Sequence, residues 1–223
     1  MSYRFEATSD FFRSVLDVDT ILGYADDSDS NRDLFLKLAT VTLVTKFQVF
    51  VEKALEEFRY ELNEKPSRAL STYALMNSLK LSLVEDNALT GLVKHANFTD
   101  DKRNRIIGFL NSISYISDAE QIIDEAFRFR TKFPLGKTGK SELIDLLKQI
   151  DGDSNPFDGF GDERIGKLDS LLQMRHLIIH QDRYIGTKES CAESIAFLRE
   201  LVTYIDSYLN QKMHIINQNT NGA

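Results

Sequence analysis

The sequence is poor in cysteine, proline and tryptophan, with one, three and none among 223 residues. The single Cys191 excludes an intrachain disulfide framework and a cysteine-rich zinc module, and it fits a reducing compartment, so we expect a cytoplasmic protein. Because prolines are few, long helices can continue unbroken. The 15 phenylalanines and 8 tyrosines argue against a disordered or collagen-like chain.

Basic residues are fewer than acidic residues: the chain has 27 Lys and Arg and 34 Asp and Glu, which gives a formal net charge of −7. This deficit disfavours a general nucleic-acid coat, because attraction to phosphate scales with positive charge, but it permits a local basic site. The first twenty residues contain acidic groups and no continuous apolar core. They predict neither a signal peptide nor a membrane span, so we expect no membrane partner and a mature chain that starts here.

Apolar residues recur with the period of a helix, and no strand alternation stands out. The longest predicted helix spans residues 31–63, has one apolar face, and ends where Pro66 cannot continue its hydrogen bonds. Another helix is predicted to start near Pro66, and Thr99 with the two acids after it predicts the start of a third. Further helices are predicted over about 117–131, 141–150, 162–180 and 187–213. The sequence therefore predicts an all-α fold.

One domain accounts for the chain. A chain of this length can bury roughly 70% of its unfolded surface in a single core, and no repeat, low-complexity tract or long linker demands a second domain. We predict one domain over residues 1–223, with 1–30 as an N-terminal extension, 31–213 as a helical bundle and 214–223 as a flexible tail. Six of the eleven glycines fall between residues 136 and 166, which we interpret as loops.

The most informative segment is LDSLLQMRHLIIHQDR at residues 168–183, because a cation interrupts its apolar face. At about 100° per residue, Arg175 falls in the middle of an apolar sector. The sector consists of Leu168, Leu171, Leu172 and Ile179. The residues three and four positions from Arg175 are apolar, so no local carboxylate can neutralise it. Since burying an unpaired guanidinium is costly, its partner is an acid on another helix, a second subunit, or an anion such as phosphate.

Two histidines flank the same sector one helical turn apart, His176 and His180. Two interpretations stay open at this point: Arg175 pairs with a structural carboxylate and the histidines are interfacial, or the three groups border a phosphate site. Glu52, on the longest helix, is a candidate to orient Arg175 or a histidine, and Glu56 and Glu57 are equally well placed. The histidine spacing also suits a metal, but HEXXH and a third ligand are absent, so we expect no metal and no cofactor.

The stretch RHLIIH, from Arg175 to His180, matches the R-x4-6-H signature, and the sequence here resembles HEPN domains, particularly the RiboL-PSP-type branch. The motif lies late in the chain before a final long helix, as in that family, and the resemblance covers roughly residues 33–213. One departure is His176, where the family often has a small polar residue such as asparagine. The resemblance implies a HEPN-type antiparallel helical bundle with additional short helices.

The resemblance also implies an activity, that of a metal-independent endoribonuclease acting as a homodimer with the two motifs facing across one cleft. An RNA 2′-hydroxyl would attack the adjacent phosphate, leaving a 2′,3′-cyclic phosphate and a 5′-hydroxyl. Arg175 would hold the phosphate, His180 would transfer the proton and His176 would support them. A toxin or antiviral defence effector is suggested as well, with an antitoxin or regulatory subunit as partner. The alternative is a non-catalytic helical module that binds RNA or another protein.

A basic strip at residues 126–140 bears on the substrate. It carries no acid and five basic residues, namely Arg128, Arg130, Lys132, Lys137 and Lys140. Phenylalanines interleave with them, so the strip could stack bases while following an RNA backbone. The alternative is a solvated helix end with its phenylalanines packed inward. Gly139 and Lys140 imitate the end of a P-loop, but Pro134 occupies the position of the required upstream glycine, which argues against nucleotide hydrolysis.

Overall fold

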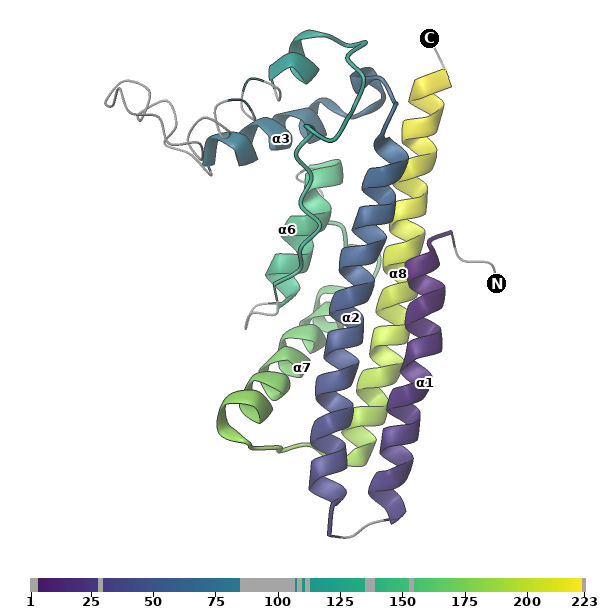
Figure 1. Ribbon diagram of the computed structural model, residues 1–223, viewed down its shortest axis with the longest axis vertical. Coiled ribbons are helices and arrows are strands. Elements are labelled where there is room, and N and C mark those ends of the chain that lie inside the picture. The colour runs from purple at the N-terminus through teal and green to yellow at the C-terminus, as the bar shows by residue number, and fades with distance from the viewer. Residues whose placement is uncertain are drawn as a thin grey trace, which may run out of the picture. The chain divides into compact units, whose positions relative to one another are not determined.

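The computed structural model describes residues 4–27, 30–84, 107, 110, 113–134, 139–152 and 155–221. Its long helices are α1 (Glu6–Asp27), α2 (Arg32–Leu62), α3 (Thr72–Val84), α6 (Gly139–Asp151), α7 (Asp162–Gln181) and α8 (Lys188–Asn221), with a 3₁₀ turn at Ser67–Ala69 (Figure 1). The described residues contain no β-strand, and their one isolated bridge joins Pro66 to Ile122. The predicted all-α class is confirmed.

The chain packs as two compact units. Unit 1 consists of Met1–Glu57, Thr131–Leu146 and Asn155–Asn210, and unit 2 of Phe58–Arg130, Leu147–Ser154 and Gln211–Ala223. The helices α2, α6 and α8 therefore contribute residues to both units. Each unit is described by itself below.

In unit 1, α1 lies beside α2 and α8 and runs antiparallel to both (Figure 1). The register with α2 is marked by Lys46 Nζ, 3.0 Å from an Asp17 oxygen. The register with α8 is marked by the Thr8 hydroxyl, which donates to Asp206 at 2.6 Å, and by Arg199, 3.0 Å from Asp19. The side chains of α1 that face α2 and α8 are buried, among them Phe11, Val15 and Val18. The residues predicted as an extension thus form a core helix of unit 1.

Helix α7 returns antiparallel to α8. Arg164 near its start pairs with Glu200 of α8, while Tyr184, just past its end, lies with Ser190 near the start of α8 in one cleft. The predicted helices over 141–150 and 162–180 are confirmed as α6 and α7. With α1 and α7 running one way and α2 and α8 the other, unit 1 has the expected antiparallel arrangement.

The predicted helix over 117–131 is wrong, because residues 118–131 form turns and extended backbone. Two aspartates favour turns over a helix in this segment, because the Asp118 side chain accepts from the Glu120 N–H and that of Asp124 from the Ala126 N–H. Its backbone then pairs with the chain after α2, as when the Ile123 N–H donates to the Lys65 carbonyl at 2.8 Å. Side-chain and long-range hydrogen bonds here replace the helical ones.

The predicted frayed tail is also wrong, because α8 continues to Asn221. Met213 and Ile216 are buried in unit 2, and Lys65 donates to the Asn217 side chain at 2.8 Å. The C-terminal end of α8 has few apolar residues in a helical pattern. Polar contacts with residues 65–69 therefore help to stabilise it. The helix expected after Thr99 lies mainly outside the described residues.

By length and apolar composition alone, α2 could cross a membrane, and no other helix in the described part of the chain meets that criterion. A core helix has the same composition, and α2 buries Phe47, Val51 and Leu55. In unit 1 its first 26 residues supply the wall on which α1 and the segment before α6 pack.

Candidate functional site

The first half of α7 is held firmly in unit 1. Its buried side chains are Ile165, Leu168, Leu171 and Leu172. The start of α6 packs closely on this half, since a Cβ placed on Gly139 would lie 2.0 Å from Leu172 Cδ1, and the Lys140 N–H donates to Asp169 at 2.8 Å. A side chain at position 139 would therefore displace the Leu172 side chain.

The second half of α7 loses this cover. The sequence places Ile179 in the same buried sector, but its side chain is 48% exposed. That expectation is wrong because the contacts with α6 are made at Asp169 and Leu172, about two turns before Ile179. The last two turns of α7 therefore present a partly apolar surface.

Arg175 occupies the boundary between the two halves and is half-buried. Within the described part of the chain its buried Nε has no hydrogen-bond partner, and no carboxylate forms an ion pair with it. The first interpretation, in which Arg175 pairs with a structural carboxylate, therefore finds no such carboxylate among the described residues. A buried donor without an acceptor is costly, which makes this position suited to an anion from outside the chain.

Two imidazoles follow Arg175 in the sequence, on the last two turns of α7. The ring centroids of His176 and His180 are 4.3 Å apart, with the ring planes tilted by 49°. His176 is half-buried and His180 is exposed. The last two turns of α7 thus carry one cation and two groups able to carry a proton, and His180 is open to solvent.

The end of α7 is attached to α2 by a residue that the sequence did not point to. Lys37 Nζ donates to the Asp182 carbonyl at 2.7 Å and lies 2.9 Å from its carboxylate and 2.8 Å from that of Asp33. These hydrogen bonds to Asp33 and Asp182 raise the pKa of Lys37 above its ordinary value. Asp182 follows the last residue of α7 with a φ of +50°, so the attachment sits two residues after His180. The spacing of Asp33 and Lys37 on a helix was the available signal.

Glu52 anchors the segment before α6 instead of contacting the motif. Its carboxylate accepts from Lys132 Nζ at 3.0 Å, from the Phe133 N–H at 3.1 Å and from Gln48 at 3.1 Å. Burial would raise the pKa of this carboxyl, but the three hydrogen bonds outweigh it and the pKa is lowered. The hydrogen bonds that the structure gives Glu52 therefore support residues 132–133, and its orienting role toward Arg175 stays a prediction. Glu57 accepts from the Glu6 and Ala7 N–H groups at the start of α1.

The described basic residues of the strip fall in different units. Arg128 and Arg130 belong to unit 2, Lys132 and Lys140 to unit 1, and Lys137 lies outside the described residues. Lys132 is exposed and pairs with Glu52, while Lys140 pairs with Asp162 at 2.5 Å. The RNA-binding role of these residues stays a prediction.

The phenylalanines of the strip pack inward. Phe127 and Phe133 are buried, and Phe129 stacks on Phe58 at 5.8 Å. The alternative interpretation expected this packing but placed it on a helix end, which is wrong because the segment is not helical.

No group of three or more metal-ligating side chains gathers in the described part of the chain. Burial raises the pKa of the Cys191 thiol, which holds that residue in its protonated, unreactive form. The motif of α7 offers one guanidinium and two imidazoles.

The family model of RiboL-PSP-HEPN matches residues 8–211, a span that includes Arg175, His176 and His180. This chain belongs to the RiboL-PSP-HEPN family. No curated protein and no solved structure matches it. The resemblance inferred from the RHLIIH motif is therefore confirmed. HEPN domains are often ribonucleases, so membership of the RiboL-PSP-HEPN family makes an RNase-type function possible.

Proposed function

We propose that this RiboL-PSP-HEPN chain is a metal-independent endoribonuclease, with Arg175 and His180 at the reacting phosphate and His176 in support. The observation that carries the proposal is the Arg175 guanidinium, whose buried Nε has no hydrogen-bond partner among the described residues, on the same helix as two imidazoles 4.3 Å apart. Phosphate oxygens accept hydrogen bonds from a guanidinium, which can hold two oxygens of one phosphate at once.

The chemistry requires no metal. His180 takes the proton of the RNA 2′-hydroxyl as that oxygen attacks the adjacent phosphorus, and Arg175 stabilises the negative charge that develops on the phosphate oxygens. The bond from phosphorus to the 5′-oxygen breaks, and that oxygen receives a proton from the second imidazole or from water. The products are a 2′,3′-cyclic phosphate and a 5′-hydroxyl, so no water is consumed in this step.

A second copy of the chain is part of the proposal. Large apolar side chains are exposed near the end of α7 and the start of α2, namely Leu34, Leu38, Ile179 and Ile185. The bond from Lys37 to Asp182 places them at the same end of unit 1. A copy covering this surface would bury apolar area beside both motifs, which supports a homodimer with one shared cleft.

The biological setting is proposed from the family resemblance. We place the enzyme in the cytoplasm, with RNA as substrate, as a toxin or antiviral defence effector restrained by an antitoxin or other regulatory subunit. The competing function is a non-catalytic module that uses the same exposed apolar surface to bind a protein or RNA.

Cleavage of RNA in the presence of EDTA tests the proposal. We expect the intact protein to release fragments with 2′,3′-cyclic phosphate ends, and His180→Ala and Arg175→Ala to lower the rate by about 100-fold or more. His214→Ala, which changes an exposed histidine on α8, is the matched control and should cleave normally. Light scattering should show that all variants stay dimeric.

Two results would contradict the proposal. An unchanged cleavage rate in His180→Ala would remove that residue from the chemistry. A stable complex with RNA that is never cleaved, in any buffer, would favour the non-catalytic module.

A further inference from the structure

A cleft in unit 1 has no part in the proposed ribonuclease. Its walls come from the middle of α7, from Tyr184 after that helix, from the first turns of α8 and from Thr40 of α2, all within unit 1. The α7 residues of the lining recur every three or four positions from Lys167 to Met174, so they share one face of the helix. Neither Arg175 nor the two histidines of the motif line this unit 1 cleft.

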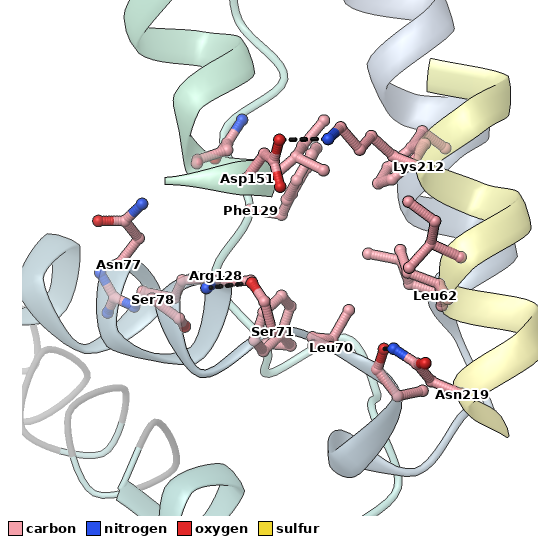
Figure 2. Close-up of a pocket in the computed structure, with 18 residues that line it drawn as sticks. Leu62, Leu70, Ser71, Asn77, Ser78, Arg128, Phe129, Asp151, Lys212 and Asn219 are labelled. Atoms are coloured by element: carbon pink, nitrogen blue, oxygen red, sulfur yellow. Dashed lines mark hydrogen bonds and ion pairs between the residues drawn. The ribbon is translucent and has the colours of Figure 1, made fainter. Parts of the chain in front are cut away.

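The unit 1 cleft is large enough for a small molecule. Its volume is about 310 Å³, at the lower end of the range of roughly 300–1,000 Å³ that is typical of ligand sites. The cavity of unit 2, drawn in Figure 2, has a volume of about 70 Å³. The floor of the unit 1 cleft is apolar and buried, and it includes Leu171 and Phe197. A ligand with one or two rings would bury its apolar part there.

Four hydroxyl groups in the lining are buried or half-buried, and none has a proton left for a ligand. A hydroxyl has one proton to donate and two lone pairs that accept. Each of the four donates to a main-chain carbonyl over 2.8 to 3.2 Å, and they belong to Thr40, Tyr184, Ser190 and Ser194. The Ser190 oxygen also accepts from the Thr187 N–H at 2.8 Å. The Tyr184 and Ser194 oxygens therefore offer a ligand acceptors and not donors.

The Cys191 thiol follows the same pattern. Its Sγ lies 3.9 Å from Thr40 Oγ1, whose own proton goes to the Leu36 carbonyl, so the thiol is the donor of this pair. Burial raises the pKa of the Cys191 thiol, which keeps that proton in place. The inner lining thus accepts hydrogen bonds, and a ligand has to bring the donor.

The charged side chains of the lining lie at the rim of the unit 1 cleft. They are Lys167 and Glu193, one of each sign and both exposed. The inner lining holds no charged side chain that would stabilise a buried ion, so the buried part of a ligand has to be neutral. Ser170 is exposed at the rim as well, and it can donate there together with Lys167.

We propose that the unit 1 cleft binds a small neutral primary carboxamide with an apolar body. Such a group combines two N–H donors with one carbonyl acceptor. The N–H groups donate inward to the oxygens of Tyr184 and Ser194, and the carbonyl oxygen accepts at the rim, where Lys167 is a donor. The apolar body lies on the buried floor. The proposal is independent of the ribonuclease, since it concerns binding alone.

Titration of the full-length protein with benzamide, followed by calorimetry and saturation-transfer NMR, tests the site. We expect saturable binding of one benzamide per chain, half-complete below about 10 mM, as a ligand of this size allows. Acetophenone has the same shape but a methyl group in place of the amide nitrogen. It should bind at least about 10-fold more weakly, because it leaves the buried acceptors without a donor.

Two charged compounds of the same shape test the requirement for neutrality. Benzamidinium keeps N–H donors but carries a positive charge, and it should bind more weakly than benzamide because the inner lining has no carboxylate to pair with it. Benzoate carries a negative charge and no N–H donor, so it should not bind.

Two variants with matched controls locate the site. Tyr184→Phe keeps the ring and removes one acceptor, so it should weaken benzamide binding about 5-fold and leave acetophenone unaffected. Tyr24→Phe, at an exposed tyrosine outside the lining, should change neither. Ser194→Leu fills the cleft and should abolish binding, whereas Ala196→Leu, at an exposed residue of the same helix outside the lining, should not. Thermal unfolding establishes that each variant is folded, and if one is not, the other still decides.

Several outcomes would overturn the proposal. Equal binding of benzamide and acetophenone, or unchanged benzamide binding in Tyr184→Phe, would show that the acceptors of the cleft do not select a donor. Tighter binding of benzamidinium or of benzoate than of benzamide would assign the cleft to cations or to anions. Absence of saturable benzamide binding, or undiminished binding to folded Ser194→Leu, would remove the site from the cleft.

Discussion

The two halves of α7 share one apolar stripe but differ in what covers it. The first half buries Leu168, Leu171 and Leu172 against its neighbours in unit 1. The second half exposes Ile179, and the buried Nε of Arg175 has no acceptor among the described residues. Most of the free energy of folding that α7 contributes therefore comes from its first half. The second half is available to bind something outside the chain.

Two other charged side chains, Glu52 and Arg68, have several hydrogen-bond partners. Glu52 in unit 1 accepts three hydrogen bonds, and Arg68 in unit 2 pairs with Glu120 at 2.8 Å and donates to the carbonyls of Asn219 and Thr220. Arg175 is the contrasting case. Glu52 and Arg68 thus have partners within the chain, whereas the described residues supply none for the Arg175 Nε.

The largest expected effect comes from removing side chains from the two halves of α7. Leu168→Ala should lower the free energy of unfolding by about 2–4 kcal/mol, because it leaves a cavity in the core of unit 1. Ile179→Ala should lower it by less than about 1 kcal/mol in the monomer, since its side chain is already half exposed. Urea unfolding followed by circular dichroism, at low protein concentration, measures both. Equal losses would mean that the end of α7 is covered after all.

A smaller effect separates the two arginines. Arg68→Met should lower the free energy of unfolding by about 1–2 kcal/mol, because the Glu120 carboxylate and two carbonyls lose their donor. Arg175→Met should cost less than about 0.5 kcal/mol or even stabilise the fold, since it removes a buried donor that has no partner in the described part of the chain. The same denaturation experiment compares them, and a larger loss for Arg175→Met would reveal a partner for it in the folded chain.

The smallest effect concerns pH at Glu52. Its pKa is lowered from 4.5, so the carboxylate stabilises unit 1 above about pH 4.5, and this contribution is lost as the pH falls through the lowered pKa. Glu52→Gln should therefore reduce the unfolding midpoint at neutral pH and flatten its decline in acid. Glu56→Gln is the control, because Glu56 is 55% exposed and lies 3.9 Å from Lys132. Thermal unfolding between pH 3 and pH 7 provides the test, and parallel curves for all three proteins would contradict it.

Much of the fold could be predicted from local pattern. The apolar periodicity located α2 and α7 to within a few residues, because each helix has a long stripe and clear ends. Prediction failed over residues 117–131, where Asp118 and Asp124 bond to nearby N–H groups and the backbone pairs with residues 64–68. Such pairing depends on a segment about fifty residues away, so the apolar periodicity of residues 117–131 cannot predict it.

For the candidate site, spacing placed Arg175, His176 and His180 on one helix, and the family followed from the same six residues. Lys37 was missed because its partner Asp182 is 145 positions away. The apolar face of α7 and the residues of its motif could be predicted from the sequence alone. The reason is that the helical period fixes the direction in which each side chain points. Which half of that face is covered, and whether Arg175 finds an acceptor, was decided by tertiary packing, because the covering side chains come from helices far apart in the chain.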